Sequence, residues 1–338
     1  MRRFLNQIEQ CVIAVVVATL IMNFGLSFYN RAAGWIDRQS GSTTAIYNPG
    51  SSMLHGTEGR GYHRIDARGY VNDTSKLAEK YVIAVGASYT QGKEVNNGYR
   101  YTDLLNSWLG YNDEAFVYNV SQDAYYFPKI VKGFSALTQE FPQAEKIIIE
   151  IGRTDFAIEE MEDSLNQRAF DEIQTGERIK ETLTWKKKVN IKIKEYSPLL
   201  YNINSKVQTL KSIKPTAEND SGKQDADLIK YRESLERVFT LLTQIYDKEI
   251  IILYHPRVSI GKDGNLNVFA EDTDEVFRKV CTKYDVSFVD MSEKFKQSYN
   301  DSFEVPYGFS NTTLGQGHFS AAGHRMVAEE LIKYLENQ

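Results

Sequence analysis

Hydrophobic runs alternate with amphipathic stretches along the chain beyond residue 80. Five runs rich in Val and Ile predict buried strands at residues 81–86, 115–120, 146–152, 249–256 and 286–291. Between them lie helical patterns, such as residues 99–110 and 231–246, the second with apolar residues at Leu235, Val238, Phe239 and Leu242. Strands of this kind alternating with such helices indicate a parallel sheet covered on both faces. We therefore predict an α/β fold, a three-layer α/β/α sandwich.

The N-terminal segment predicts one membrane-spanning helix. No residue from Gln10 to Asn30 carries a charge, and 21 residues at about 1.5 Å each reach about 31 Å, one hydrocarbon thickness. We expect a cytoplasmic stub at 1–9, a transmembrane signal anchor at 10–30, and the rest of a single-pass cell-membrane protein outside the cytoplasm. Arginines occur in nearly equal numbers before and after this segment, so they constrain its orientation in the membrane only weakly. A cleaved secretory signal and a buried soluble helix are the alternatives.

The remaining chain divides into a lead-in and one large domain. Residues 31–80 are rich in Gly and turn formers and predict an extended lead-in. The domain spans 81–338. Residues 156–227 interrupt its alternation of strands and helices with long, charged helical stretches, which predicts a helical insertion or lid. The basic run at 184–194 lies there and is expected to be a solvated face, with membrane-surface contact as the alternative.

Composition excludes several classes of function. The 338 residues have a net charge of -5 and a pI near 5.7, whereas nucleic-acid binding needs a basic face, so no nucleic-acid partner is expected. The two cysteines, Cys11 and Cys281, fall in the predicted anchor and in the domain, so no disulfide is expected. The five histidines show no metal-ligand spacing, and neither a metal site nor a cofactor is expected.

Candidate chemistry lies where the first predicted strand ends, in "VIAVGASYTQG" at 82–92. A phosphate-binding P-loop needs four residues between its glycines, and here there are five. The nucleophile elbow of α/β-hydrolases needs Gly two residues after Ser, and Thr90 stands there. A third interpretation fits: Gly86 relieves crowding as the strand ends, and Ser88 is presented at a helix start, where backbone amides bind developing negative charge.

This stretch resembles the first block of the SGNH or GDSL hydrolase family, Gly-Asp-Ser-x-Thr-x-Gly, and the likeness continues through residues 93–110. "GRTD" at 152–155 and "GHFSAAGH" at 317–324 resemble two later blocks. The resemblance implies an SGNH, flavodoxin-like fold and a cofactor-independent serine mechanism. Ser88 would be the nucleophile and His318 the general base. Ser320 is expected to cap the last helix, and His255 and His324 are expected to be structural.

The resemblance also implies an oxyanion hole, in which the sequence departs from the family. The expected donors are the backbone amides of Ser88 and Ala124 and the hydroxyl of Thr154, which stands where the family has Asn. Ala87 replaces the family's Asp.

The acid that the family places two or three residues before the histidine is missing, since those positions hold Gly315 and Gln316. A backbone carbonyl or Glu304 could orient His318 instead, and the sequence does not decide between them.

These residues predict a membrane-anchored serine esterase or O-acyl (acetyl) transferase. By family analogy, the substrate would be an acylated cell-surface glycan or another small ester, and a membrane acyltransferase is a possible partner. The alternative is a non-catalytic SGNH-like domain that binds glycan or serves as a scaffold for a membrane acyltransferase. The substitutions at the oxyanion positions and beside His318 make that alternative reasonable.

Overall fold

A computed structural model describes residues 2–34, 47–168, 196–203 and 225–336, together with positions 185, 189 and 207. Its central element is a parallel sheet of five strands in the order β4-β3-β5-β6-β9. These strands are β3 (Leu77–Val85), β4 (Ala115–Asn119), β5 (Ala144–Ile151), β6 (Glu249–Tyr254) and β9 (Ser287–Asp290). All five predicted strands are present, because each run of Val and Ile is buried on both faces of the sheet.

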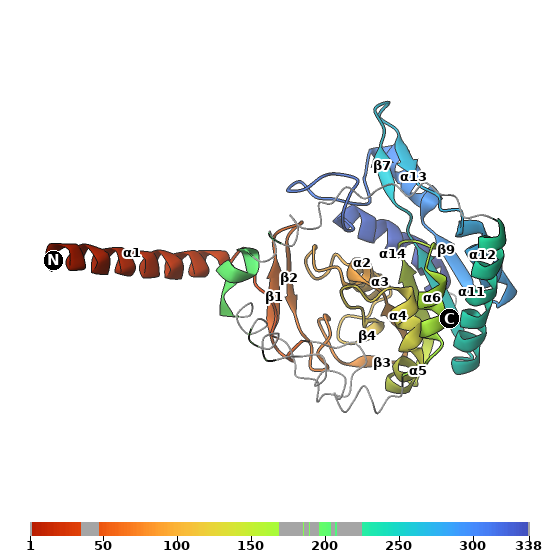
Figure 1. Ribbon diagram of the computed structural model, residues 1–338. Coiled ribbons are helices and arrows are strands. Elements are labelled where there is room, and N and C mark those ends of the chain that lie inside the picture. The colour runs from red at the N-terminus through yellow and green to blue at the C-terminus, as the bar shows by residue number, and fades with distance from the viewer. Residues whose placement is uncertain are drawn as a thin grey trace.

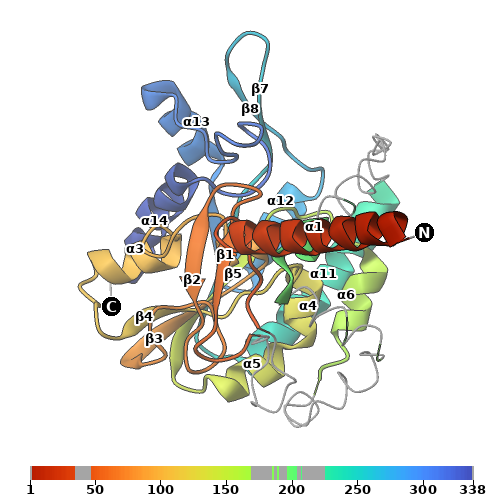
Figure 2. The same ribbon diagram turned by 90° about the vertical axis from the view of Figure 1, so that its left-hand side faces the viewer.

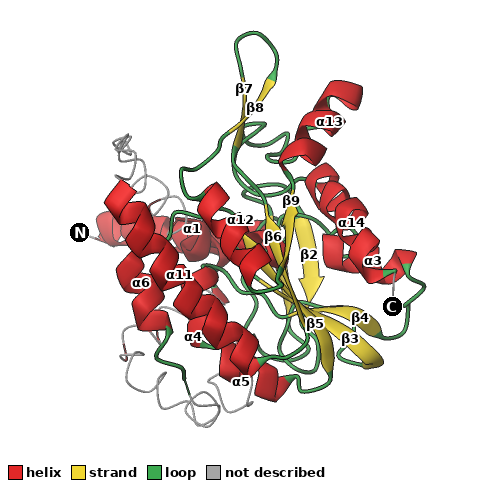
Figure 3. Ribbon diagram, turned by 90° about the vertical axis from the view of Figure 1, so that its right-hand side faces the viewer, coloured by secondary structure: helices red, strands yellow, loops and turns green. Residues whose placement is uncertain are grey.

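Helices cover both faces of this sheet (Figure 3). One face carries α4 (Phe127–Lys132), α5 (Phe134–Glu140), α6 (Ile158–Ser164), α11 (Asp225–Ile245) and α12 (Asp274–Lys283); the other carries α3 (Tyr101–Trp108), α13 (Ser292–Ser302) and α14 (Ala321–Leu335). Alternate residues of β3 supply the two cores, with Ile83 and Val85 on the first face and Val82 and Ala84 on the second. The predicted three-layer α/β/α sandwich with a parallel sheet is confirmed.

The N-terminal helix α1 (Arg2–Leu26) extends away from this domain (Figure 1). Its segment Asn6–Leu26 has a mean hydropathy of 1.8, and no part of its most apolar stretch is buried against the rest of the protein. A helix so apolar and so exposed to solvent is unlike a core helix of a soluble protein. Among the described residues it is the one helix long and apolar enough to span a membrane or to serve as a signal anchor.

The predicted lead-in contains a β-hairpin. Strands β1 (Ser52–His55) and β2 (Gly61–Arg64) pair antiparallel, and Leu54 also bridges to Arg31, five residues after α1 ends. Figure 2 shows this hairpin between α1 and the sheet. Met53, Ile65 and Val71 form a small separate core with Ala33. The hairpin thus ties the segment after α1 to the domain.

Two short elements remain, and one prediction falls mostly outside the described residues. The helix α2 (Ser88–Gln91) follows β3, and a second hairpin is formed by β7 (Val258–Ile260) and β8 (Leu266–Val268). Of the insertion predicted at 156–227, the structure describes 156–168 with α6, residues 196–203, and the start of α11. The rest, including nearly all of the basic run at 184–194, lies outside the described residues.

Candidate active site

Ser88 is the first residue of α2, directly after β3. Glu150, from the neighbouring strand β5, fixes this turn: its Oε2 accepts the Ala87 amide at 2.8 Å and the Thr90 hydroxyl at 3.2 Å. A Cβ at Gly86 would lie 2.4 Å from the same oxygen, so only glycine allows the carboxylate this close. The turn that the sequence predicted therefore depends on a carboxylate 62 residues farther along the chain than Ser88.

His318 comes from the loop that precedes α14. Phe319 is fully buried and bridges to Tyr307, and the Gly308 amide donates to the His318 carbonyl at 2.9 Å. Ser320 caps α14 by accepting the Gly323 amide at 3.1 Å, as predicted. These contacts hold the loop on both sides of the imidazole.

The structure brings Ser88 and His318 together and adds a carboxylate that the sequence did not identify. His318 Nε2 lies 2.8 Å from Ser88 Oγ, and Nδ1 lies 2.7 Å from Glu58 Oε2. The His318 backbone amide donates to the other oxygen of Glu58 at 2.7 Å. A proton on Nδ1, held by the carboxylate, leaves Nε2 free to accept the hydroxyl proton of Ser88. This is the arrangement of a serine–histidine–acid triad.

The pKa values of the pair follow from these contacts. Burial opposes ionisation of Glu58, but its hydrogen bonds to His318 and the charge of that imidazole outweigh burial and lower the pKa of Glu58. For His318, burial disfavours the imidazolium, yet the hydrogen bond to Glu58 and the charges of Glu94 and Glu58 outweigh it and raise the pKa. The site therefore stabilises a positive charge on His318.

Glu58 occupies the tip of the β1–β2 hairpin, and the chain around it is closely fitted. Asn311 Oδ1 accepts the Gly59 amide at 2.9 Å, and Asn311 Nδ2 donates to the Gly59 carbonyl at 3.2 Å. Gly317 has a φ of +83°, and a Cβ there would lie 2.1 Å from Glu58 Oε1. Both the hairpin tip and the glycine before His318 are thus needed for the carboxylate to reach the ring.

The prediction that Glu304 orients His318 is corrected. Glu304 Oε2 pairs with Arg325 of α14 and accepts the Ser302 hydroxyl at 3.2 Å. Its carboxylate is committed to a guanidinium, while Glu58 occupies the position beside His318. The alternative, in which a neutral backbone carbonyl accepts from His318 Nδ1, is also corrected, because Glu58 Oε2 lies at that nitrogen.

The predicted role of the Thr154 side chain is also corrected. Thr154 is fully buried, and its hydroxyl donates to Asp274 Oδ1 at 2.5 Å and lies 2.8 Å from Thr273 Oγ1. A hydroxyl has a single proton. Because Asp274 takes that proton, Thr154 serves the start of α12 and has none for an oxyanion.

Ala124 lies in the loop after β4, next to the Ser88 turn. The Gln122 amide of this loop donates to the Gly86 carbonyl at 3.1 Å, and Ala124 adopts a left-handed conformation with φ 58°. An alanine at positive φ is uncommon and marks a constrained backbone. The Ala124 and Ser88 amides stay predictions as oxyanion donors.

His255 and His324 occupy buried positions, as the sequence predicted. His255 Nε2 contacts Glu150 Oε1 at 2.9 Å and Nδ1 contacts the Tyr307 hydroxyl at 3.0 Å. His255 thus extends the network that begins at the Ser88 turn. His324 accepts the Tyr101 amide at 3.3 Å, and burial lowers the pKa of His324 to about 3.

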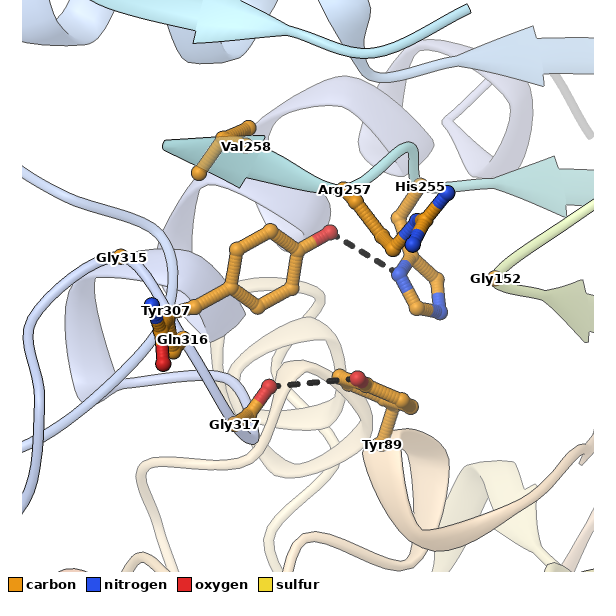
Figure 4. A pocket seen from close by; sticks show the side chains of 9 residues that line it. All are labelled: Tyr89, Gly152, His255, Arg257, Val258, Tyr307, Gly315, Gln316 and Gly317. Atoms are coloured by element: carbon orange, nitrogen blue, oxygen red, sulfur yellow. Dashed lines mark hydrogen bonds between the residues drawn. The ribbon is translucent and has the colours of Figure 1, made fainter. Parts of the chain in front are cut away.

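Two open cavities flank the Ser88 turn at the carboxyl ends of β3, β5 and β6, where α/β proteins place their ligands. The smaller, of about 190 Å³, is drawn in Figure 4; Tyr89 forms one wall by donating to the Gly317 carbonyl at 3.1 Å. The larger, of about 370 Å³, is lined by Ala87, Tyr126 and Phe127 and by the charged residues Glu150, Arg153, Asp155, Arg257 and Glu271. Tyr89, Gly152 and Arg257 line both cavities. Among the described residues, no group of three or more His, Cys, Asp or Glu side chains is arranged to hold a metal ion.

Comparison with protein-family models finds no match, and comparison with curated proteins finds none. The fold is similar to that of a carbohydrate esterase family 2 enzyme from Corynascus thermopiles, at 13% identity over 80% of this chain and 69% of that one, with a TM-score of 0.40. An acetyl xylan esterase has 13% identity over 76% and 99%, with a TM-score of 0.40. A psychrotrophic esterase from Pseudoalteromonas has 10% identity over 77% and 100%, with a TM-score of 0.37.

All three of these solved structures are esterases by name. Their low identities and TM-scores do not define a substrate or a mechanism for this chain. Its chemistry depends on its own side chains.

Proposed function

We propose that this protein is a serine esterase or O-acyl transferase that acts through Ser88, His318 and Glu58. One observation carries the proposal: the unbroken contact from Glu58 Oε2 through the His318 ring to Ser88 Oγ, at 2.7 and 2.8 Å. A serine hydroxyl is a weak nucleophile at neutral pH and needs an adjacent base, which in turn needs an orienting group. All three roles are occupied in this site.

In the first half-reaction, Ser88 Oγ attacks the ester carbonyl carbon while its proton passes to His318 Nε2. The carbonyl oxygen becomes an oxyanion, for which the amides of Ser88 and Ala124 are the proposed donors. The imidazolium then protonates the leaving alcohol oxygen, the carbon–oxygen bond of the ester breaks, and an acyl-serine forms. Glu58 stabilises the imidazolium through both steps.

In the second half-reaction, a hydroxyl group attacks the acyl-serine as His318 takes its proton. Water as the acceptor gives hydrolysis, and a sugar hydroxyl gives transfer. The attacking oxygen bonds to the acyl carbon, the bond between that carbon and Ser88 Oγ breaks, and His318 returns the proton to Ser88 Oγ as the product leaves. The same residues serve both outcomes, so only the acceptor distinguishes an esterase from a transferase.

The proposed substrate is a short acyl ester, such as an O-acetyl group, on a cell-surface glycan. The larger cavity beside Ser88 supports a polar substrate, because its lining combines aromatic rings with five charged side chains rather than a continuous apolar surface. The apolar helix α1 supports a membrane-anchored, extracytoplasmic enzyme. A membrane acyltransferase would then be a suitable source of acyl groups.

A second candidate is a non-catalytic glycan-binding or scaffold partner of such an acyltransferase. The observation that favours it is the commitment of the Thr154 hydroxyl to Asp274, which removes one predicted oxyanion donor. Loss of one donor costs about 10²- to 10³-fold in other hydrolases. The two candidates differ in whether Ser88 reacts at all.

The experiment uses the full chain extracted in detergent. The wild type should hydrolyse p-nitrophenyl acetate and be labelled by a fluorophosphonate probe, whereas Ser88→Ala should lose at least about 10³-fold in kcat/KM and all labelling. Ser107→Ala is the matched control, because it removes a hydroxyl that is exposed on α3. A wild type that neither turns over the ester nor reacts with the probe would favour the non-catalytic candidate.

A further inference from the structure

Glu94 is a buried carboxyl group that the serine mechanism does not use. It follows α2 by three residues and is 1% exposed. Its Oε1 atom is shielded from solvent and has no hydrogen-bond partner in the described part of the chain. A buried, unpaired carboxyl oxygen is costly, so its retention needs a reason.

The unpaired oxygen lies against the triad. Glu94 Oε1 is 3.5 Å from His318 Nδ1, the nitrogen that Glu58 contacts at 2.7 Å, and it is 4.0 Å from His55 Nε2. His55 precedes Glu58 in the same hairpin, so β1 and the segment after α2 enclose one edge of the imidazole. His318 therefore has two carboxyl groups at Nδ1, one hydrogen-bonded and one at longer range.

We infer that Glu94 is a second positioning carboxylate for His318, which sets the basicity of the imidazole alongside Glu58. The inference deepens the proposed function and rests on the role of His318 as the base. Glu94 lines neither of the two cavities beside Ser88. Its effect passes through the imidazole ring of His318, because a negative charge 3.5 Å from Nδ1 stabilises the protonated form of the ring.

The charged groups around Glu94 act in both directions, and Lys93 opposes the effect by lowering the pKa of His318 as well as that of Glu94. Burial is the main cause that raises the pKa of Glu94 to about 7, against the lowering effects of His318 and Lys93, while Asp123 and Glu58 raise it further. Lys93 is paired with Asp123. Burial also lowers the pKa of His55 to about 4, so His55 is neutral near pH 7. Glu94 therefore gains its charge within the pH range in which a histidine base works.

The direction of the effect is fixed by charge. Ionised Glu94 favours the His318 imidazolium, so it raises the pKa of the imidazole and stabilises the charge that forms when Ser88 attacks. Because the two groups interact, their protons leave in steps that belong to the pair. Removing the Glu94 charge should lower the pH at which His318 titrates and should weaken the base.

The first test measures the His318 titration without catalysis. Ser88→Ala protein, made with ¹³C-labelled histidine, is titrated by NMR with and without Glu94→Gln. The substitution should lower the His318 midpoint by about one pH unit, the scale of an opposite charge at this distance. Glu79→Gln, which removes an exposed carboxylate on β3, should leave it in place. This test stands even if the protein proves to have no esterase activity.

The second test measures kcat/KM for p-nitrophenyl acetate against pH. Glu94→Gln should shift the acidic limb down by a similar amount and lower the plateau several-fold, and Glu94→Asp should restore part of the shift. A merely structural Glu94 would lower the rate equally at every pH and lower the melting temperature. An unshifted His318 midpoint in a folded Glu94→Gln protein overturns the inference, and an absent wild-type rate with a shifted midpoint overturns only the proposed function.

Discussion

Glu58→Gln is the substitution that tests the triad most directly. Glu58 accepts two hydrogen bonds from His318, one from the backbone amide and one from Nδ1, each at 2.7 Å. A glutamine has one acceptor oxygen and one NH₂ group. If the oxygen keeps the backbone amide, the NH₂ faces Nδ1 and favours the tautomer that carries its proton on Nε2. That tautomer cannot accept the proton of Ser88.

The magnitude follows from the loss of the correct tautomer and of the carboxylate charge. In a serine protease, an acid-to-amide change that leaves the geometry intact lowers kcat about 10⁴-fold. At 1.36 kcal/mol per factor of ten, this is about 5.4 kcal/mol of transition-state stabilisation. Because the side chains of Glu58 and His318 keep 20% and 27% exposure, water can replace part of the interaction. We expect a loss of about 10³- to 10⁴-fold in kcat.

The assay measures kcat and KM for p-nitrophenyl acetate, the rate of fluorophosphonate labelling, and the melting temperature. A selective fall in kcat and labelling, with little change in KM or melting, is the expected result. Glu304→Gln is the control, since it breaks the ion pair with Arg325 and leaves His318 untouched; its rate should stay within about threefold of the wild type. An active Glu58→Gln protein, or an inactive Glu304→Gln protein, would refute the assignment of the acid.

Three further substitutions test the geometry around the site. Gly317→Ala should lower kcat about 10²-fold or more, because its Cβ would collide with Glu58 and its φ is +83°; wild-type turnover would contradict the fit. Thr154→Val should lower the free energy of unfolding by about 1–3 kcal/mol, because Asp274 Oδ1 loses the Thr154 hydroxyl while Oδ2 keeps its other donors, and kcat per folded molecule should stay unchanged. A selective 10²-fold loss of kcat with unchanged folding stability would restore Thr154 to the oxyanion hole. The free energy of unfolding should fall as pH drops from about 6.5 towards 3, because burial lowers the pKa of His324 in the folded protein to about 3, and its ring therefore binds a proton only on unfolding. His324→Asn should flatten that fall when stability is measured by denaturant titration at each pH. An unchanged pH profile in this variant would count against the role of His324.

The sheet was predictable because its signal is local. The central strands are buried on both faces, so a continuous run of Val and Ile is required where they pass through the core, as in Ile147, Ile148 and Ile149 of β5. For the same reason, the order of strands and helices along the chain could be predicted from the sequence. The β1–β2 hairpin was missed because its short strands pack against a few residues of their own small core, and the glycines around the turn indicated only extended chain.

Ser88 and His318 could be proposed as a pair from the sequence because each lies within a short recognisable stretch, a tight turn after a strand and a capped helix start. Glu58 was not, because it meets His318 across 260 residues of sequence. The glycines on both sides of Glu58 in "HGTEGRG" could have suggested a hairpin with Glu58 at its tip. Nothing in that stretch indicates which histidine the tip reaches.

The position of Glu58 changes what counts as the functional unit of this chain. The sheet and helices from residue 81 onward supply Ser88 and His318, but the group that holds the base comes from the lead-in before them. The hairpin that carries Glu58 is hydrogen-bonded through Leu54 to Arg31, five residues after the apolar helix, and through Gly59 to Asn311 beside the site. The orientation of His318 therefore depends on a hairpin that lies between α1 and the domain in sequence. A chain that began at residue 81 would keep the proposed nucleophile and the proposed base and would lose the carboxylate that contacts His318 Nδ1.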